Sequence, residues 1–141
     1  MKIILLVISL FLLSSFVFAE SIPVEVVEII DGDTAEVKMQ SGNRFSLRLI
    51  GIDCFEAYNN HRVELQANEN NITAKEVLKK GKESREYLKK LKNNAKTSSF
   101  DFKGIDKYSR VLGILYFDNI NINQKLIDKG YCKVFHYIEK W

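Results

Sequence analysis

The stretch VEVVEIIDGDTAEVKMQSGNRFSLRLI, residues 24–50, consists of apolar runs separated by turn residues. Three of these runs have the alternation of β-strands, at residues 24–30, 34–39 and 44–50. Asp31-Gly32-Asp33 separates the first two runs, and Ser41-Gly42-Asn43 separates the second from the third. Aspartate, asparagine, serine and glycine favour tight turns because of their local hydrogen bonding and backbone freedom. The stretch therefore predicts a three-stranded β-meander.

The chain downstream adds further elements to this meander. Residues 51–71 are mostly polar and predict an irregular segment, whereas residues 73–94 have helical periodicity. Gly81 is expected either to kink this helix or to mark its start. Then follow two strands, a short helix and an extended segment, at residues 98–103, 109–117, 121–129 and 131–138. Three strands, a helix, two strands and a helix is the element order of a five-stranded Greek-key barrel with helices, the OB-fold. The fold class is α+β.

Length and composition favour a single globular domain. Of the 141 residues, 46% are hydrophobic and 28% are charged, which is the balance of a folded protein rather than a disordered one. Two cysteines are too few for a disulfide scaffold or a four-cysteine zinc site. Residues 20–72 hold 10 acidic and 4 basic residues, and residues 73–110 hold 12 basic and 5 acidic. The basic part fits either a solvated helix face or a polyanionic partner.

Residues 1–19, MKIILLVISLFLLSSFVFA, have the features of a secretory signal peptide. Lys2 precedes an apolar run, and Ala19 is a small residue of the kind that signal peptidase requires. Cleavage before Glu20 leaves a domain at residues 20–141 that is exported to the periplasm or the medium, without stable membrane association. A retained membrane anchor is the alternative, but the run is short for a spanning helix of about 20 residues.

Carboxylates and arginines gather where the expected strands end. Asp31 and Asp33 lie in the first turn, and Arg48 is followed closely by Asp53 and Glu56. A further basic and aromatic group, Asp106-Lys107-Tyr108-Ser109-Arg110, begins the fifth strand. Taken singly, each group is ordinary turn, capping or surface chemistry. Their order places the carboxylates of Asp33, Asp53 and Glu56 at strand ends of one small barrel, together with two arginines, Arg48 and Arg110.

Five segments resemble, in order, the staphylococcal nuclease-like (thermonuclease) family. They are IDGDT (30–34), FSLRLIGIDCFE (45–56), GKESREYLKKLKNNAK (81–96), DKYSRVLGILY (106–116) and LIDKGYCKV (126–134). The resemblance that they carry runs from about Val24 to Ile138, nearly all of the chain after the predicted signal peptide. The resemblance implies a five-stranded OB barrel with helices. The chain ends at Trp141, before the final C-terminal helix that many members of the family carry.

The resemblance also implies a calcium-dependent phosphodiesterase that acts on DNA and RNA and cleaves the P–O5′ bond to leave 3′-phosphates. By position, the calcium ligands would be the carboxylates of Asp33 and Asp53 and the backbone carbonyl of Cys54. Glu56 would orient or deprotonate the attacking water, and Arg48 and Arg110 would bind the phosphate. Lys107 and Tyr108 would line the nucleotide pocket.

The implied roles agree with elementary chemistry. Calcium prefers oxygen ligands and keeps several waters, which leaves room for a phosphate oxygen. Two guanidinium groups can each grip phosphate oxygens through two parallel hydrogen bonds, and they help most as charge accumulates on the phosphorus. A small pocket takes one splayed base better than a paired one, so single-stranded or open nucleic acid is the expected substrate. The expected molecule is a monomer.

The chain also departs from the family pattern in two places, and its two cysteines allow two states. Cys54-Phe55 replaces a Thr-Pro pair, and loss of the proline is expected to loosen the loop that aims Glu56. The long segment at 57–80 is either a disordered surface loop or a substrate-gating loop. Cys54 and Cys132 form either a disulfide or two free buried thiols, and an exported protein permits the first.

Two other functions compete with the nuclease. One is an OB-fold module that holds single-stranded nucleic acid without cutting it, which needs basic and aromatic residues but not Asp33, Asp53 and Glu56 together. The other is a truncated, inactive nuclease remnant. The joint presence of the three carboxylates favours the enzyme.

Overall fold

The computed structural model describes residues 20–136. The predicted signal peptide at 1–19 lies outside the described residues, as do residues 137–141. No helix among residues 20–136 is long and apolar enough to cross a membrane.

The predicted meander forms the first half of a barrel. Its strands are β1 (Ile22–Asp31), β2 (Thr34–Met39) and β3 (Arg44–Leu49), each antiparallel to the next. On β2 and β3 the pair Ala35 and Leu47 lies directly across the ladder, and both side chains are fully buried. The alternating apolar residues therefore face the barrel interior, as expected from the sequence pattern.

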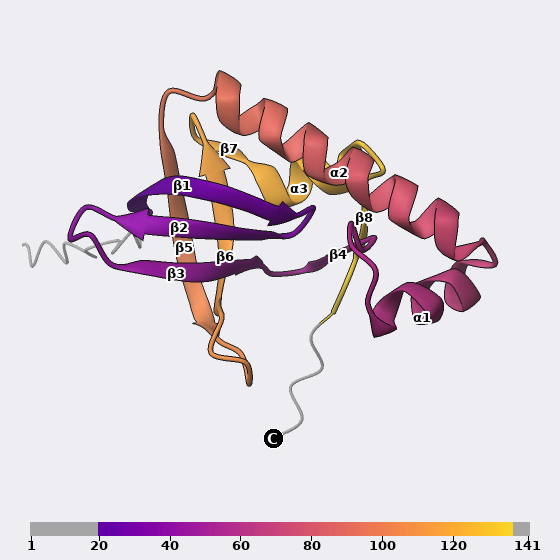
Figure 1. Ribbon diagram of the computed structural model, residues 1–141. Coiled ribbons are helices and arrows are strands. Elements are labelled where there is room, and N and C mark those ends of the chain that lie inside the picture. Colours follow the sequence, from indigo (N-terminus) through magenta and orange to yellow (C-terminus); the bar gives the residue numbers. More distant parts are fainter. Residues whose placement is uncertain (1–19, 137–141) are drawn as a thin grey trace, which may run out of the picture.

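Two later strands close the barrel. These are β5 (Ser98–Ile105) and β6 (Val111–Phe117), and the strand order is β3-β2-β1-β5-β6. A parallel pairing of β3 with β6 joins the two edges, and the short β7 (Ile120–Asn121) extends the sheet beyond β6 (Figure 1). At Gly113 on β6 an added Cβ would lie 2.7 Å from the Asp101 carbonyl oxygen, so glycine permits the close approach of β5 to β6. The predicted OB barrel is confirmed.

Helix α2 (Ala74–Asn94) covers the barrel beside β1, close to the predicted range. Thr73 and Glu76 form a capping box at its start, and its buried face includes Val77 and Leu88. Gly81 lies inside the helix rather than at its start. Its Cβ would lie 2.1 Å from the backbone oxygen of Glu56, so glycine is required there for the helix to contact the segment after β4.

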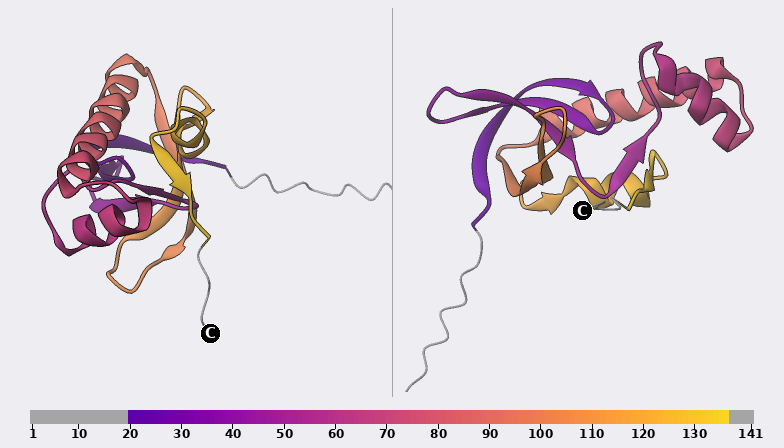
Figure 2. Two further views of the ribbon diagram at one scale, coloured as in Figure 1. Left: turned by 90° about the vertical axis from the view of Figure 1, so that its right-hand side faces the viewer. Right: turned by 90° about the horizontal axis from the view of Figure 1, so that it is seen from below.

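Helix α1 (His61–Asn70) corrects the prediction of an irregular segment at 51–71 and of a disordered surface loop at 57–80. Two asparagines delimit it, because the Asn60 side chain accepts a hydrogen bond from the Arg62 backbone N–H and Asn71 ends it in the left-handed conformation (φ 52°). Val63 and Ala67 pack with Val77 of α2 in a small separate apolar cluster. In Figure 2 both helices extend beyond the end of the barrel that carries β4.

The remaining elements connect the last part of the described chain to the strand that follows β3. Helix α3 (Ile122–Asp128) precedes Gly130, which has φ 74°, and β8 (Cys132–Val134) then pairs antiparallel with β4 (Ile52–Cys54). Cys54 lies opposite Cys132, and the two form a disulfide across 78 positions of sequence.

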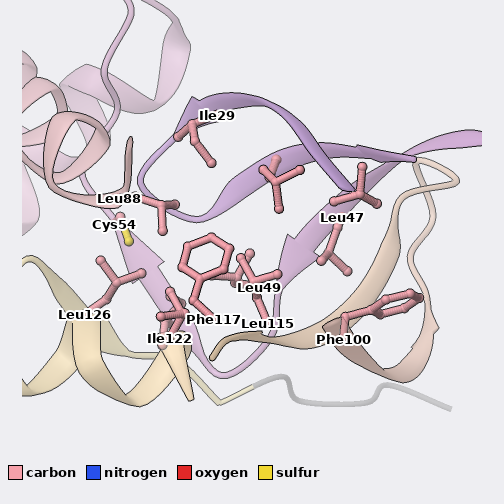
Figure 3. Close-up of a cluster of buried hydrophobic side chains, with 14 of the residues drawn as sticks. Ile29, Leu47, Leu49, Cys54, Leu88, Phe100, Leu115, Phe117, Ile122 and Leu126 are labelled. Atoms are coloured by element: carbon pink, nitrogen blue, oxygen red, sulfur yellow. The ribbon is translucent and has the colours of Figure 1, made fainter. Parts of the chain in front are cut away.

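One main core fills the barrel and the space under α2 and α3 (Figure 3). Its largest fully buried side chains come from β1, β3, β4, β6, α2 and α3: Ile29, Leu47, Leu49, Ile52, Leu88, Leu115, Ile122 and Leu126. Cys54 and Cys132 belong to the same core, so the disulfide is shielded from solvent. The site residues of β3 and β4 are thus attached to the best-packed part of the molecule.

Candidate functional site

Two arginines link the three predicted acidic residues into one network. Arg48, at the end of β3, forms ion pairs with Asp33 and with Asp53, the latter at 3.4 Å. Arg62, on α1, pairs with Asp53 at 2.8 Å and with Glu56 at 3.2 Å. The order of contacts is therefore Asp33, Arg48, Asp53, Arg62 and Glu56. The carboxylates that the sequence places at separate strand ends do converge.

Arg48 is held inside the protein. Its side chain is 5% exposed, and besides the two ion pairs its Nη1 donates to the Asp33 carbonyl at 3.3 Å and its Nη2 to the Ile52 carbonyl at 3.2 Å. A buried guanidinium is stable only when its donors and charge are satisfied. Arg48 thus ties the β1–β2 turn to β4.

Asp33 is buried on the other side of this contact. Its Oδ2 accepts a hydrogen bond from the Cys54 backbone N–H at 2.8 Å, and its Oδ1 accepts from the Thr34 hydroxyl at 3.3 Å. Asp33 therefore fixes the start of the segment that carries Cys54 and Glu56. The sequence pattern places Asp33 at the site, but this contact depends on the tertiary fold.

Arg62 is the functional residue that the sequence pattern does not predict. Its Nη2 donates to both Asp53 carboxylate oxygens, at 2.8 and 3.0 Å. Partial burial acts to lower the pKa of Arg62, but the hydrogen bond to Asp53 and the charges of Asp53 and Glu56 outweigh it and raise the pKa overall. Arg62 therefore stays charged and neutralises the acidic pair.

Asp31 lies in the same turn as Asp33 and interacts electrostatically with Arg48 and Arg110. Burial raises the pKa of Asp31 above its usual value, while the charges of Arg48 and Arg110 and a hydrogen bond with Thr34 oppose the rise. Its Oδ1 accepts from the Asp33 backbone N–H at 3.2 Å. This carboxyl shapes the turn and contributes to the field at the site.

A cavity of about 640 Å³ opens beside the network. Its lining comes from five parts of the chain: Arg48, Asp53, His61, Arg62, Lys107, Tyr108, Arg110 and Phe135. The predicted residues Arg48, Lys107, Tyr108 and Arg110 thus share one pocket, whereas Asp33 and Glu56 do not line it. The sequence predicts no role for His61, Arg62 or Phe135. Four permanently basic side chains against one carboxylate make the pocket suited to an anion.

The loop between β5 and β6 presents Arg110 to this pocket. Asp106 accepts from the Arg110 Nε at 2.7 Å and from the backbone N–H groups of Tyr108 and Arg110 at 2.8 and 3.0 Å. Burial acts to raise the pKa of Asp106, but these hydrogen bonds outweigh it and lower the pKa. Lys107 Nζ and the Arg110 guanidinium lie 5.0 and 5.5 Å from the centre of the Tyr108 ring. The loop is a preorganised basic and aromatic surface.

The atoms expected to coordinate calcium are all oxygens, which is the type of ligand that this ion prefers. Among residues 20–136 no group of three or more histidine, cysteine or acidic side chains is arranged to hold a metal ion. Asp33 and Asp53 flank Arg48, and the Cys54 carbonyl accepts a hydrogen bond from Gln66 Nε2 at 3.0 Å. Asp33 Oδ1 and Asp53 Oδ1 each already accept from two groups. Asp33 Oδ2, Asp53 Oδ2 and the Cys54 carbonyl each accept one hydrogen bond, so each keeps a lone pair for a metal ion.

The chain matches one protein-family model, described as "Staphylococcal nuclease homologue", over residues 46–140. The match covers more than half of the chain and spans the elements from β3 to β8. It includes the residues that line the basic pocket. With the closed barrel and the pocket at its edge, this match shows that the protein belongs to the staphylococcal nuclease homologue family.

Proposed function

We propose that this protein is a calcium-dependent nuclease that hydrolyses DNA and RNA at the P–O5′ bond and leaves 3′-phosphates. The observation that carries the proposal is the single pocket in which Arg48 and Arg110 stand beside the acidic side chain of Asp53. A phosphodiester is an anion that resists attack by water, so its hydrolysis needs positive groups around the phosphate. Membership of a nuclease family supports the same conclusion.

Arg110 takes the larger share of phosphate binding. Its side chain is 33% exposed, and within residues 20–136 its Nε pairs with Asp106 while its terminal nitrogens have no hydrogen-bond partner. Arg48 is 5% exposed, and both of its terminal nitrogens already bond to protein oxygens. Arg110 can therefore donate two parallel hydrogen bonds to phosphate oxygens, whereas the buried Arg48 contributes its positive charge. Lys107 and Tyr108 hold the adjoining nucleotide.

Glu56 acts as the general base. Its side chain is 13% exposed and is aimed by two neighbours, since Oε2 accepts from Asn60 Nδ2 at 2.7 Å and Oε1 pairs with Arg62. A carboxylate held in one orientation needs to reach only one water to take its proton. The pair with Arg62 also restrains this carboxylate beside α1.

Asp33, Asp53 and the Cys54 carbonyl would hold the calcium ion. When bound, the ion supplies Lewis-acid stabilisation of a phosphate oxygen. The protein's own contribution is the placement of these oxygens, which the disulfide at Cys54 and the Asp33 bond to the Cys54 N–H support. Arg62 competes for Asp53, because one carboxylate cannot fully neutralise two cations.

This competition predicts that Arg62→Met binds calcium about fivefold more tightly than the wild type. Loss of a partly exposed ion pair is worth about 1 kcal/mol, and that energy corresponds to about a factor of five in affinity. Isothermal titration of the metal alone measures the change. Arg44→Met is the matched control, because Arg44 lies at the other end of β3 and pairs with Glu36. Unchanged or weaker calcium binding by Arg62→Met would show that Arg62 does not compete.

A second candidate function is binding of single-stranded nucleic acid without cleavage. The observation that favours it is the basic and aromatic loop, in which Tyr108 is 67% exposed beside Lys107. Such a loop binds bases by stacking whether or not the phosphate is cut. A third possibility, an inactive remnant, predicts no cooperative thermal transition and no stabilisation by calcium with a nucleotide bisphosphate.

Digestion of denatured DNA with calcium and with EDTA separates these functions. The nuclease is expected to cut only with calcium, and Glu56→Gln is expected to lower the rate by at least about 100-fold. Glu36→Gln is the matched control, because Glu36 lies on β2 and pairs with Arg44 instead of a site residue. Binding without cutting in any condition would favour the non-catalytic module. Equal cutting in EDTA would overturn the calcium requirement.

We also propose that the protein is exported and acts as a monomer. The disulfide in the core supports export, since such bonds persist in oxidising compartments. Cell fractionation with sequencing of the mature N-terminus tests the export, with a start at Glu20 expected. Light scattering of the purified protein tests the monomer.

A further inference from the structure

Gln66 is a buried polar side chain that contacts the main chain on both sides of Phe55. It lies on α1 and is 4% exposed. Its Nε2 donates to the Cys54 carbonyl at 3.0 Å, and its Oε1 accepts from the Glu56 backbone N–H at 2.9 Å. Both ends of the amide are therefore used by one short stretch of backbone.

This stretch has no regular secondary structure to hold it. Strand β4 ends at Cys54, and α1 begins only at His61. The phenylalanine at 55 leaves the backbone freer than the proline that many members of the family have there. Two hydrogen bonds from a single buried side chain replace that restraint, because moving either peptide group would leave a buried donor or acceptor unpaired.

The rest of the surroundings restrain the same segment from other sides. Asn60 Nδ2 donates to Glu56 Oε2 at 2.7 Å, and the Asn60 side chain also caps α1. The Glu56 carbonyl lies against Gly81 of α2, where a Cβ would approach to 2.1 Å. Among these contacts only Gln66 holds the peptide groups of Cys54 and Glu56 together.

We infer that Gln66 is a positioning residue that sets the Cys54 carbonyl and the Glu56 carboxylate in their working orientation. The inference rests on the proposed function for its catalytic consequence. The structural part of the inference is that the backbone between β4 and α1 becomes mobile when the amide group of Gln66 is removed. Helix α1 is then a part of the site rather than a surface insertion.

Amide hydrogen exchange at Glu56 tests this placement without any cleavage assay. Gln66→Met keeps the length and volume of the side chain but removes both hydrogen bonds, so the Glu56 N–H is expected to exchange at least tenfold faster. Gln66→Glu retains the acceptor and loses the donor, so exchange at Glu56 is expected to stay within about threefold of the wild type. Gln124→Met is the matched control, because Gln124 is an exposed residue of α3.

Kinetics then tests the catalytic consequence. Gln66→Met is expected to lower kcat for denatured DNA by about 10- to 100-fold with KM within about threefold, because a misplaced base slows chemistry more than binding. A merely structural role would leave kcat per folded molecule unchanged, so the folded fraction is measured by circular dichroism. If Gln66→Met does not fold, the Gln66→Glu variant provides both readouts, with Glu56 exchange retained and kcat lowered because the Cys54 carbonyl loses its donor.

The outcomes are distinguishable. Folded Gln66→Met with wild-type exchange at Glu56 or with wild-type kcat overturns the inference, as does Gln66→Glu with fast exchange at Glu56. If the wild type itself does not cleave, the proposed function fails, but the exchange of the Glu56 amide still decides whether Gln66 positions the segment.

Discussion

Replacement of Arg110 by methionine is expected to lower kcat/KM for denatured DNA by about 100- to 1000-fold, with little loss of stability. The guanidinium lies in the basic pocket, and in the described part of the chain only its Nε is paired, so its terminal nitrogens are available to a phosphate. A phosphate-binding group that acts on accumulating charge contributes more in the transition state than in the ground state. The expected loss is therefore larger in kcat than in KM.

Stability is expected to change by less than about 1 kcal/mol, because the pair with Asp106 is partly exposed. Single-turnover kinetics and urea denaturation measure the two effects separately. Arg44→Met serves as the control, since it removes an exposed arginine whose partner Glu36 is outside the pocket. Arg110→Lys should recover only part of the rate, because a lysine cannot form two parallel bonds to phosphate. Wild-type activity of Arg110→Met would refute its assignment to phosphate binding.

The second large effect concerns the disulfide between Cys54 and Cys132. Replacing both cysteines by serine is expected to lower the free energy of unfolding by about 2–5 kcal/mol. The bond closes a loop with a sequence separation of 78, and both sulfurs lie in the main core. The unfolded chain gains freedom when the link is lost, and the two hydroxyls are poorly suited to an apolar site.

Urea denaturation with intact and reduced wild type provides the comparison for the double variant. Reduced wild type is expected to unfold at a midpoint near that of the variant, and both midpoints should fall below that of the oxidised protein. An unchanged midpoint in the double variant would show that the bond adds nothing to stability. Because Cys54 follows Asp53, the same variant should also bind calcium more weakly.

Much of the barrel follows from local sequence, because β2, β3 and β5 alternate apolar and polar residues and β6 is a short apolar run. The meander, its two turns and the helix that precedes Gly130 all form where local pattern predicts them. The sequence pattern does not predict α1, because only Val63, Gln66 and Ala67 are buried on it. Its apolar face is therefore too narrow to give a recognisable helical periodicity. The sequence does contain the two cap residues of α1, Asn60 and Asn71. In an asparagine-rich segment, however, they are equally typical of a loop.

One part of the candidate site could also be predicted from the sequence, and the other part depends on the tertiary fold. Arg48, Lys107, Tyr108 and Arg110 occupy one pocket, as the family resemblance implies. Arg62 and Gln66 could not be predicted, because their partners depend on how α1 docks beside β4. The disulfide was undecided for a related reason: it requires the register that sets Cys54 opposite Cys132, and that register depends on long-range packing.

The pairing of β4 with β8 makes the strand that carries Asp53 depend on the last described strand of the chain. Within residues 20–136, β4 has no strand partner other than β8, and β8 follows every other described element in the chain. A nascent polypeptide thus carries Asp53 on an unpaired strand until β8 has been synthesised. The covalent link between the two strands additionally awaits an oxidising environment. For the exported nuclease proposed above, this order of folding would keep the site incomplete inside the cell that makes the protein.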